Sequence, residues 1–192
     1  MNKSRFGVLT LDARTQQELV AILPRLRRFA LGLTRNGAQA DDLVQSACEK
    51  AITRIDQWEP GTRLDSWMFR IIQTTHIDQI RGQKRRDNYL EVIEHQGEVS
   101  FDGERAAEAS MTLDAVRRAI YNLPEDQRAV VMLVSVEGLS YKEAAETLEI
   151  PMGTLTSRLV RARTALARMM EHMNGNDDDG DNAESPTWKE VQ

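Results

Sequence analysis

The stretch that decides the fold is Ser140–Arg163, SYKEAAETLEIPMGTLTSRLVRAR. Ser140 is followed three residues later by Glu143, the pattern of a capping box, in which each side chain hydrogen-bonds to the other residue's backbone amide at a helix start. The alanines and leucine that follow predict a short helix, and Pro151 ends it. A longer helix begins at about Met152, so the stretch predicts a helix-turn-helix.

The longer helix has two distinct faces when its residues are placed about 100° apart. One face, which we expect to be buried, carries Leu155, Leu159, Ala162 and Leu166. The outward face near the helix start carries Thr154, Ser157, Arg158 and Arg161. A recognition helix presents such groups to base edges and phosphates in the major groove, so DNA binding is favoured over an ordinary solvated helix. Thr156 and Arg163 point elsewhere and are weaker candidates.

Two more helices are expected upstream of this unit. The first runs from about Met111 to Leu123, and its inward residues are predicted to be Leu113, Val116, Ala119 and Ile120. The second starts at Pro124, a residue that suits the first turn of a helix, and stops before Gly138.

The first half of the chain predicts three helices. One covers about 15–35, and Pro24 within it predicts a kink or a late start. A second follows the Asn36-Gly37 turn signal, with Asp41 and Asp42 in its first turn, where negative charge suits the helix dipole. Its apolar stripe includes Cys48, so we expect a buried structural thiol.

The third helix is expected from about Ser66 to about Gln83, after a loop over Asp56–Asp65. Near its end four cations fall within six residues: Arg81, Lys84, Arg85 and Arg86. The helix dipole explains part of such a run, but four cations exceed that need and indicate phosphate contact.

The net charge of −5 over 192 residues argues at first against nucleic-acid binding. Its distribution reverses that argument. Residues 1–86 carry 15 basic and nine acidic side chains, whereas residues 87–109 carry one against seven. Residues 110–173 balance, and residues 174–192 carry one basic against six acidic side chains. The negative charge therefore belongs to a linker-like segment and a tail of disordered composition.

Several function classes are disfavoured by the composition. No apolar run is long enough to cross a membrane, and the first residues lack a signal-peptide core. One cysteine excludes an internal disulfide, and three scattered histidines show no metal-ligand spacing. No phosphate-binding glycine loop and no nucleophile–base pair is apparent, so we expect no enzyme activity, no cofactor and no metal.

The ordered blocks of the chain carry a family resemblance. They are ADDLVQ (40–45), WMFRI (67–71), DQIR (78–81), LPEDQR (123–128), GLSYKEAA (138–145) and PMGTLTSRL (151–159). In this order they resemble an extracytoplasmic-function (ECF) sigma factor of the sigma-70 family. The resemblance implies an all-α fold with two small helical domains joined by a flexible linker. The domains implied are region 2 over 15–86 and region 4 over 111–173, with an extension at 1–14, an acidic linker at 87–110 and an acidic tail at 174–192.

The resemblance also implies sites and partners. Core RNA polymerase would be bound by Asp41, Asp42, Gln45 and Glu49. The minus-ten promoter element would be met by Arg63, Arg70, Arg81, Lys84 and Arg85, and the minus-thirty-five element by Thr154, Ser157, Arg158 and Arg161. Many relatives carry Lys or Arg where Thr156 stands. Promoter DNA, an anti-sigma factor and a cytoplasmic location are expected, without a cofactor or membrane insertion.

Some alternatives stay open at this stage. A free-standing helix-turn-helix regulator would use residues 111–172 alone, which leaves the first half of the chain unexplained. A protein that only binds other proteins, such as an anti-sigma partner, would not need the outward polar face of residues 154–161. Trp67 is either a core residue or a platform for a base, with the core favoured, and Trp58 is balanced between the two. The acidic linker either lies in a basic channel of the polymerase as RNA would, or is simply solvated.

Overall fold

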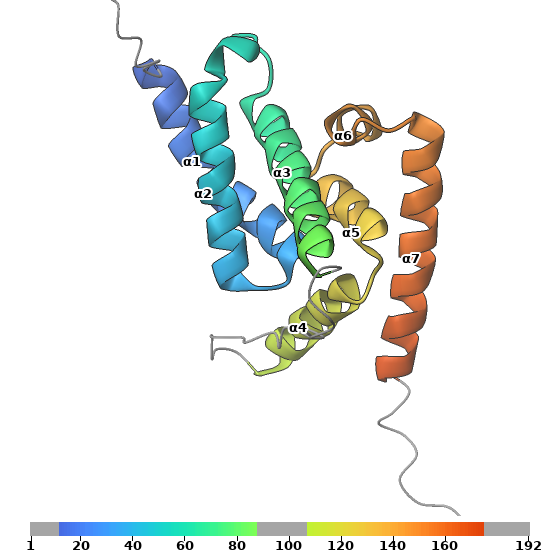
Figure 1. Cartoon of the computed structure of the whole chain (residues 1–192). Coiled ribbons are helices and arrows are strands. Elements are labelled where there is room, and N and C mark those ends of the chain that lie inside the picture. Colours follow the sequence, from blue (N-terminus) through green and yellow to red (C-terminus); the bar gives the residue numbers. More distant parts are fainter. Residues whose placement is uncertain (1–11, 88–106, 175–192) are drawn as a thin grey trace, which may run out of the picture.

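The computed structural model describes residues 12–87 and 107–174, and every regular element within these ranges is helical. Figure 1 shows their arrangement, with α5 and α6 lying between α3 and α7. The elements are α1 (Ala13–Thr34), α2 (Gly37–Thr53), η1 (Ile55–Gln57), α3 (Leu64–Asp87), α4 (Ala107–Tyr121), α5 (Glu125–Val131), η2 (Met132–Val136), α6 (Tyr141–Leu148) and α7 (Met152–Asn174). The all-α fold expected from the sequence is confirmed.

Helix α1 begins at Ala13 and continues through Pro24, so of the two effects predicted for the proline, a kink or a late start, the late start is excluded. Asp12 caps the helix by accepting a 2.8 Å hydrogen bond from the backbone amide of Thr15. This cap fixes the start eleven residues before the proline. Proline lacks an amide proton and removes one helix bond, but the apolar face of α1 packs along the whole length and retains the helix.

The turn between α1 and α2 forms at the place predicted. Arg35 adopts a left-handed conformation (φ 59°), and the Asn36 side chain accepts a hydrogen bond from Gln39 as the cap of α2. Because α2 begins at Gly37, Asp41 and Asp42 lie in its second turn. The predicted first-turn placement of these carboxylates is therefore wrong, and the cap is supplied by Asn36 instead.

The helices of the first unit close around large apolar side chains. Phe29 of α1 and Phe69 of α3 are fully buried and meet edge to face, with ring centroids 5.1 Å apart. Cys48 is half-buried, and burial raises the pKa of its thiol, as a structural role requires. Helix α3 extends to Asp87, beyond its predicted end at about Gln83, so Lys84 and Arg85 also lie within the helix.

The second unit comprises α4 to α7. Helix α5 passes into η2, one turn of π-helix, which ends at Val136 before Gly138 (φ 74°). Leu113, predicted to face inward, is 51% exposed, and Ala115 is buried in its place. The inward face of α4 is therefore set by Ala115 and Ala119 against α7.

The two units pack against each other through α1 and α3 on one side and α5, η2 and α6 on the other. Their buried apolar side chains form one continuous cluster. The approach is closest at Gly32 of α1, where an added Cβ would lie 2.7 Å from the Met132 side chain. In the described residues, the two units are thus in direct contact and share one apolar core. The predicted linker and tail lie mostly outside the described residues.

Candidate nucleic-acid and polymerase interfaces

The helix-turn-helix is built as its sequence predicts. The Ser140 hydroxyl accepts a hydrogen bond from the Glu143 amide at 3.2 Å, and the Glu143 carboxylate accepts one from the Ser140 amide at 2.8 Å. Glu149 then closes α6 in a left-handed conformation (φ 53°), and α7 begins at Met152, just after Pro151. Both bonds of the predicted capping box are present.

Replacing Ser140 with alanine is expected to lower the free energy of unfolding by about 1 kcal/mol, the usual effect of losing a serine cap. Chemical denaturation followed by circular dichroism measures the change. The matched control is Ser157→Ala, an exposed serine within α7, for which we expect less than about 0.5 kcal/mol. Equal stabilities of Ser140→Ala and the parent chain would contradict a capping role for Ser140.

The outward face of α7 is only partly free. Ser157 and Arg161 are exposed, as the predicted facing requires, while Leu155, Leu159 and Ala162 are buried beneath them. Arg158 pairs with Asp126 of α5 at 3.1 Å and keeps 29% of its side chain exposed. Thr154 is half-buried. Of the four predicted DNA contacts, Ser157 and Arg161 are therefore the most accessible.

The two weaker candidates of α7 have local partners. The Thr156 hydroxyl donates to the Met152 carbonyl at 3.0 Å, and Arg163 donates to the Tyr141 hydroxyl at 3.3 Å. Both side chains are exposed, but their polar groups already form hydrogen bonds within the chain, which agrees with their being weaker candidates for DNA contact.

The five cations predicted for the minus-ten element fall into two groups, one at each end of α3. Arg81, Lys84 and Arg85 are exposed near its end. Arg63 and Arg70 lie at its start, and each pairs with a carboxylate of the second unit: Arg63 with Glu143 at 2.6 Å, and Arg70 with Glu149. The group near the end of α3 forms no ion pair within the described residues, whereas the two arginines at the start of α3 remain exposed but are paired with carboxylates of the second unit.

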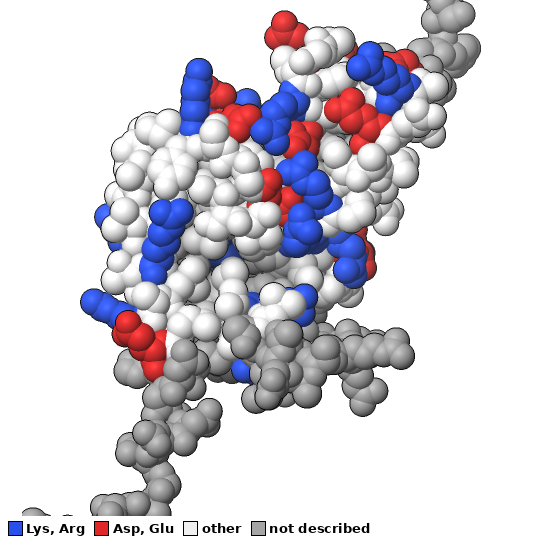
Figure 2. Space-filling model, turned by 180° about the vertical axis from the view of Figure 1, so that it is seen from behind, with Lys and Arg blue, Asp and Glu red and all other residues white. Residues whose placement is uncertain are grey.

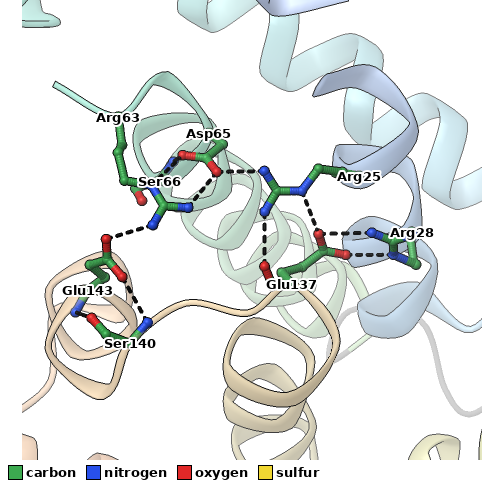
Figure 3. Close-up of polar contacts among 8 residues, drawn as sticks. All are labelled: Arg25, Arg28, Arg63, Asp65, Ser66, Glu137, Ser140 and Glu143. Atoms are coloured by element: carbon green, nitrogen blue, oxygen red, sulfur yellow. Dashed lines mark hydrogen bonds and ion pairs between the residues drawn. The ribbon is translucent and has the colours of Figure 1, made fainter. Parts of the chain in front are cut away.

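A chain of alternating charges crosses the boundary between the two units (Figure 3). It runs in order through Glu143, Arg63, Asp65, Arg25, Glu137 and Arg28. Burial alone would raise the pKa of Asp65, but the hydrogen bonds from Arg63 and Arg25 outweigh burial and hold that pKa at about 2. Asp65 is thus fully ionised at neutral pH and joins the two arginines.

Glu137 is the anchor of this network in the second unit. Its side chain has no exposed area, and its carboxylate accepts hydrogen bonds from Arg25 at 3.0 Å and from Arg28 at 2.7 Å. Arg25 also donates to the Glu137 carbonyl. None of these three residues was predicted as a site residue, because partners 109 or more positions apart leave no local pattern in the sequence.

The residues predicted to bind polymerase share one exposed side of α2. Asp41, Asp42, Gln45 and Glu49 are all exposed. Arg27 of α1 donates to Asp41 at 2.6 Å, and Gln45 donates to Glu49 at 3.1 Å. Within the described part of the chain, Asp42 pairs with no cation. Asp42 is therefore the carboxylate of this surface that is most available to a partner.

The two tryptophans lie together beside the start of α3. The rings of Trp58 and Trp67 are 6.5 Å apart and tilted by 38°, and both residues are half-buried against the core. The Trp58 indole nitrogen is buried without a hydrogen-bond partner in the described residues. This packing favours the core interpretation of Trp67 and gives Trp58 the same role.

Charges of the two signs alternate on the surface. Figure 2 shows Lys and Arg interleaved with Asp and Glu in a band across the face opposite to that of Figure 1.

Within residues 12–87 and 107–174, no group of three metal-ligating side chains occurs, and no helix has the length and apolar character that a bilayer requires.

Comparison with known proteins accounts for both units. The models for "Sigma-70 region 2" and "Sigma-70, region 4" match residues 19–86 and 113–166. The ECF RNA polymerase sigma factor EcfG of Rhodopseudomonas palustris is 32% identical over 90% of this chain and 93% of its own length. SigW of Bacillus subtilis, also an ECF RNA polymerase sigma factor, is 31% identical over 72% and 79%.

A solved structure has the same fold. The sigma factor RpoE of Bartonella quintana, crystallised in complex with the anti-sigma factor NepR, superposes with a TM-score of 0.72 at 32% identity. The match covers 82% of this chain and 97% of that one. Two family models in the expected order, relatives matched over 79% and 93% of their own length and this shared fold lead to one conclusion: the chain belongs to the ECF RNA polymerase sigma factors of the sigma-70 family.

Proposed function

We propose that this chain is an alternative sigma factor that binds core RNA polymerase, directs it to specific promoters and assists promoter opening. The observation that carries the proposal is the presence, in one chain and in order, of a region 2 unit and a region 4 helix-turn-helix. A free-standing regulator would leave α1 to α3 without a role. The chain acts as a transcription initiation factor in the cytoplasm and is not itself an enzyme.

The parts of the chain take separate tasks in this proposal. Region 2, over 15–86, meets polymerase and the minus-ten element, and region 4, over 111–173, meets the minus-thirty-five element. The segment 87–110 links them, and 1–14 and 174–192 are extensions. The exposed cations at the end of α3 and the exposed polar face of α7 support this division.

The polymerase surface is the exposed side of α2. Asp42, Gln45 and Glu49 contribute directly, while Asp41 also steadies α2 through its ion pair with Arg27. Carboxylates on a rigid helix suit a basic partner surface, because complementary charge guides association and fixes register.

Replacing Asp42 with alanine is expected to weaken binding to core polymerase about tenfold, as for a residue worth more than about 1 kcal/mol at an interface. Competition with a labelled parent chain for core polymerase measures this. The matched control is Asp114→Ala, which removes a half-buried carboxylate from α4, a helix with no proposed polymerase contact. If both variants compete as well as the parent chain, the assignment of this surface to polymerase is wrong.

Promoter contact is divided between two helices. Ser157 and Arg161 of α7, with Thr154 and Arg158 beside them, read the minus-thirty-five element in the major groove. Arg81, Lys84 and Arg85 of α3, together with Arg63 and Arg70, hold the backbone of the minus-ten element. An exposed arginine near the start of a recognition helix supports the first assignment, and a row of exposed cations supports the second.

An anti-sigma factor is proposed as a further partner. The Bartonella quintana sigma factor of the same fold is in complex with one. The sites on α2 and α3 that polymerase and DNA would use are exposed surfaces that another chain could cover.

A further inference from the structure

The outward face of α7 carries two arginines that differ in one respect. The Nε atom of Arg158 lies 3.1 Å from a carboxylate oxygen of Asp126 in α5, whereas Arg161 forms no ion pair within the described residues. The two arginines are three residues apart, so they are neighbours on one side of the helix. Helix α7 therefore presents one arginine that is held by another helix and one that is not.

The carboxylate of Asp126 is itself fixed in place. Asp126 lies in the first turn of α5, and its other oxygen accepts a hydrogen bond from the Gln127 amide at 3.0 Å. Helix α5 packs against α7, and Leu155 and Leu159 of α7 are buried. The core of the second unit thus sets the position of this carboxylate relative to α7, and the first unit takes no part in it.

The ion pair engages only one side of the Arg158 guanidinium. The contact is made through Nε, and the two terminal nitrogens form no hydrogen bond within the described residues. The side chain keeps 29% of its surface exposed. The O6 and N7 acceptors of guanine, which lie together in the major groove, match two parallel donors of an arginine. Arg158 therefore retains the donors with which an arginine reads a guanine.

A held arginine is better suited to a base edge than to a phosphate. Fixing a long side chain when DNA binds costs conformational entropy, and the pairing with Asp126 has already restricted the Arg158 side chain. The carboxylate also offsets the positive charge that would attract the DNA backbone. Backbone contacts carry no sequence information of their own, whereas base contacts do. The Asp126–Arg158 pair is therefore built for discrimination between bases.

We propose that Asp126 is a positioning residue for promoter recognition: its carboxylate holds the guanidinium of Arg158 in the orientation that reads a guanine of the minus-thirty-five element. The inference rests on the proposed role of α7 at that element. An acidic residue in the first turn of α5 also suits the helix dipole. Glu125 in the same turn meets that need too, but its carboxylate lies 3.4 Å from Nε2 of His76 and not at α7.

The test measures the base preference of the holoenzyme at each position of the minus-thirty-five element. Promoter duplexes in which this element is randomised compete for the holoenzyme, and sequencing of the bound fraction gives the preferences. Arg158→Ala identifies the base pair concerned, because the preference for guanine there is expected to fall about tenfold. Asp126→Asn should lower the same preference about fivefold and leave the other positions unchanged.

Binding to a duplex without promoter elements separates positioning from a structural role. Asparagine keeps the size of the side chain and the oxygen that accepts from Gln127, but it removes a negative charge. The affinity of Asp126→Asn for this duplex should therefore equal or exceed that of the parent chain, whereas a damaged fold would lower it. Asp126→Glu, which keeps the charge, should retain most of the guanine preference.

The matched control is Glu125→Gln, which makes the same change in charge one position earlier, on the carboxylate beside His76. We expect it to leave every base preference unchanged. An equal loss in this control would overturn the proposal, because the effect would then follow from charge alone. A further loss of base preference when Asp126→Asn is added to Arg158→Ala would overturn it as well, since Asp126 would then act without Arg158.

The same experiment distinguishes this inference from the function on which it rests. If the parent holoenzyme shows no base preference at all, the proposed function is wrong. If Arg158→Ala changes no preference, Arg158 does not read the promoter and the role of Asp126 fails with it. If Arg158→Ala loses the guanine preference but Asp126→Asn keeps it, only the positioning role of Asp126 is wrong.

Discussion

Replacing Glu137 with alanine is expected to lower the free energy of unfolding by about 3 kcal/mol. The carboxylate is fully buried and accepts hydrogen bonds from two arginines of α1, so its removal leaves Arg28 without its anion and leaves Arg25 paired with Asp65 alone. Breaking a buried ion pair costs about 3–5 kcal/mol, and the lower value applies because both arginines are partly exposed. Urea denaturation followed by circular dichroism measures the loss.

A matched control for this experiment is Glu146→Ala, an exposed carboxylate nine positions later in α6, for which we expect a change within about 0.5 kcal/mol. Should Glu137→Ala lose no more stability than this control, the network between the two units would not hold them together. If each unit stays folded on its own, the stability lost in Glu137→Ala cannot exceed the free energy with which the two units bind each other. The measured loss is then a lower limit for that free energy.

Replacing Arg161 with alanine is expected to weaken binding of the holoenzyme to its promoter roughly tenfold to 100-fold, equivalent to about 1–3 kcal/mol. Arg161 is an exposed cation on the outward face of α7, the face that a recognition helix presents to the major groove. Binding of holoenzyme to duplexes with and without the minus-thirty-five element measures the effect. The loss should appear only when that element is present.

The control for Arg161 is Arg163→Ala, which removes a cation from another side of the same helix, where it contacts Tyr141. We expect a smaller loss for Arg163→Ala and unchanged binding of both variants to core polymerase. Loss of polymerase binding in Arg161→Ala would contradict the assignment of α7 to DNA.

Local patterns predicted most of the fold. The capping box at Ser140 and Glu143, the break at Pro151 and the turn at Asn36 depend on neighbours a few residues away, and all three formed where expected. The buried face of α7 followed equally from helical periodicity. Such features depend on local backbone geometry, and residues a few positions apart in the sequence determine that geometry.

The differences from prediction have two physical sources, helix caps and tertiary packing. Pro24 did not delay α1, because Asp12 supplied the cap and the apolar face held the helix. Asp41 and Asp42 fell in the second turn of α2 because the cap lies at Asn36. Leu113 faces outward because α4 packs against α7 through its small residues Ala115 and Ala119. The first two outcomes thus depend on caps three residues from the bonded amide, and only the third depends on packing against another part of the chain.

The candidate sites show the same division. That Ser157 and Arg161 share an outward face was predictable from 3.6-residue periodicity. The pairing of Arg63 with Glu143 was not, because residues 80 positions apart meet only through the packing of α3 on α6. Sequence patterns therefore indicated which residues could contact DNA. The packing of the two units against each other showed which of those residues already form ion pairs within the chain.

The central claim is that this chain confers promoter specificity on RNA polymerase. The most direct measurement is run-off transcription by core polymerase from the bacterium that encodes the chain, on a library of that bacterium's promoters, with and without the purified protein. We predict a stable complex with core polymerase and transcripts that start at a defined set of promoters only when the chain is present. The absence of both the complex and the chain-dependent starts would contradict the assignment.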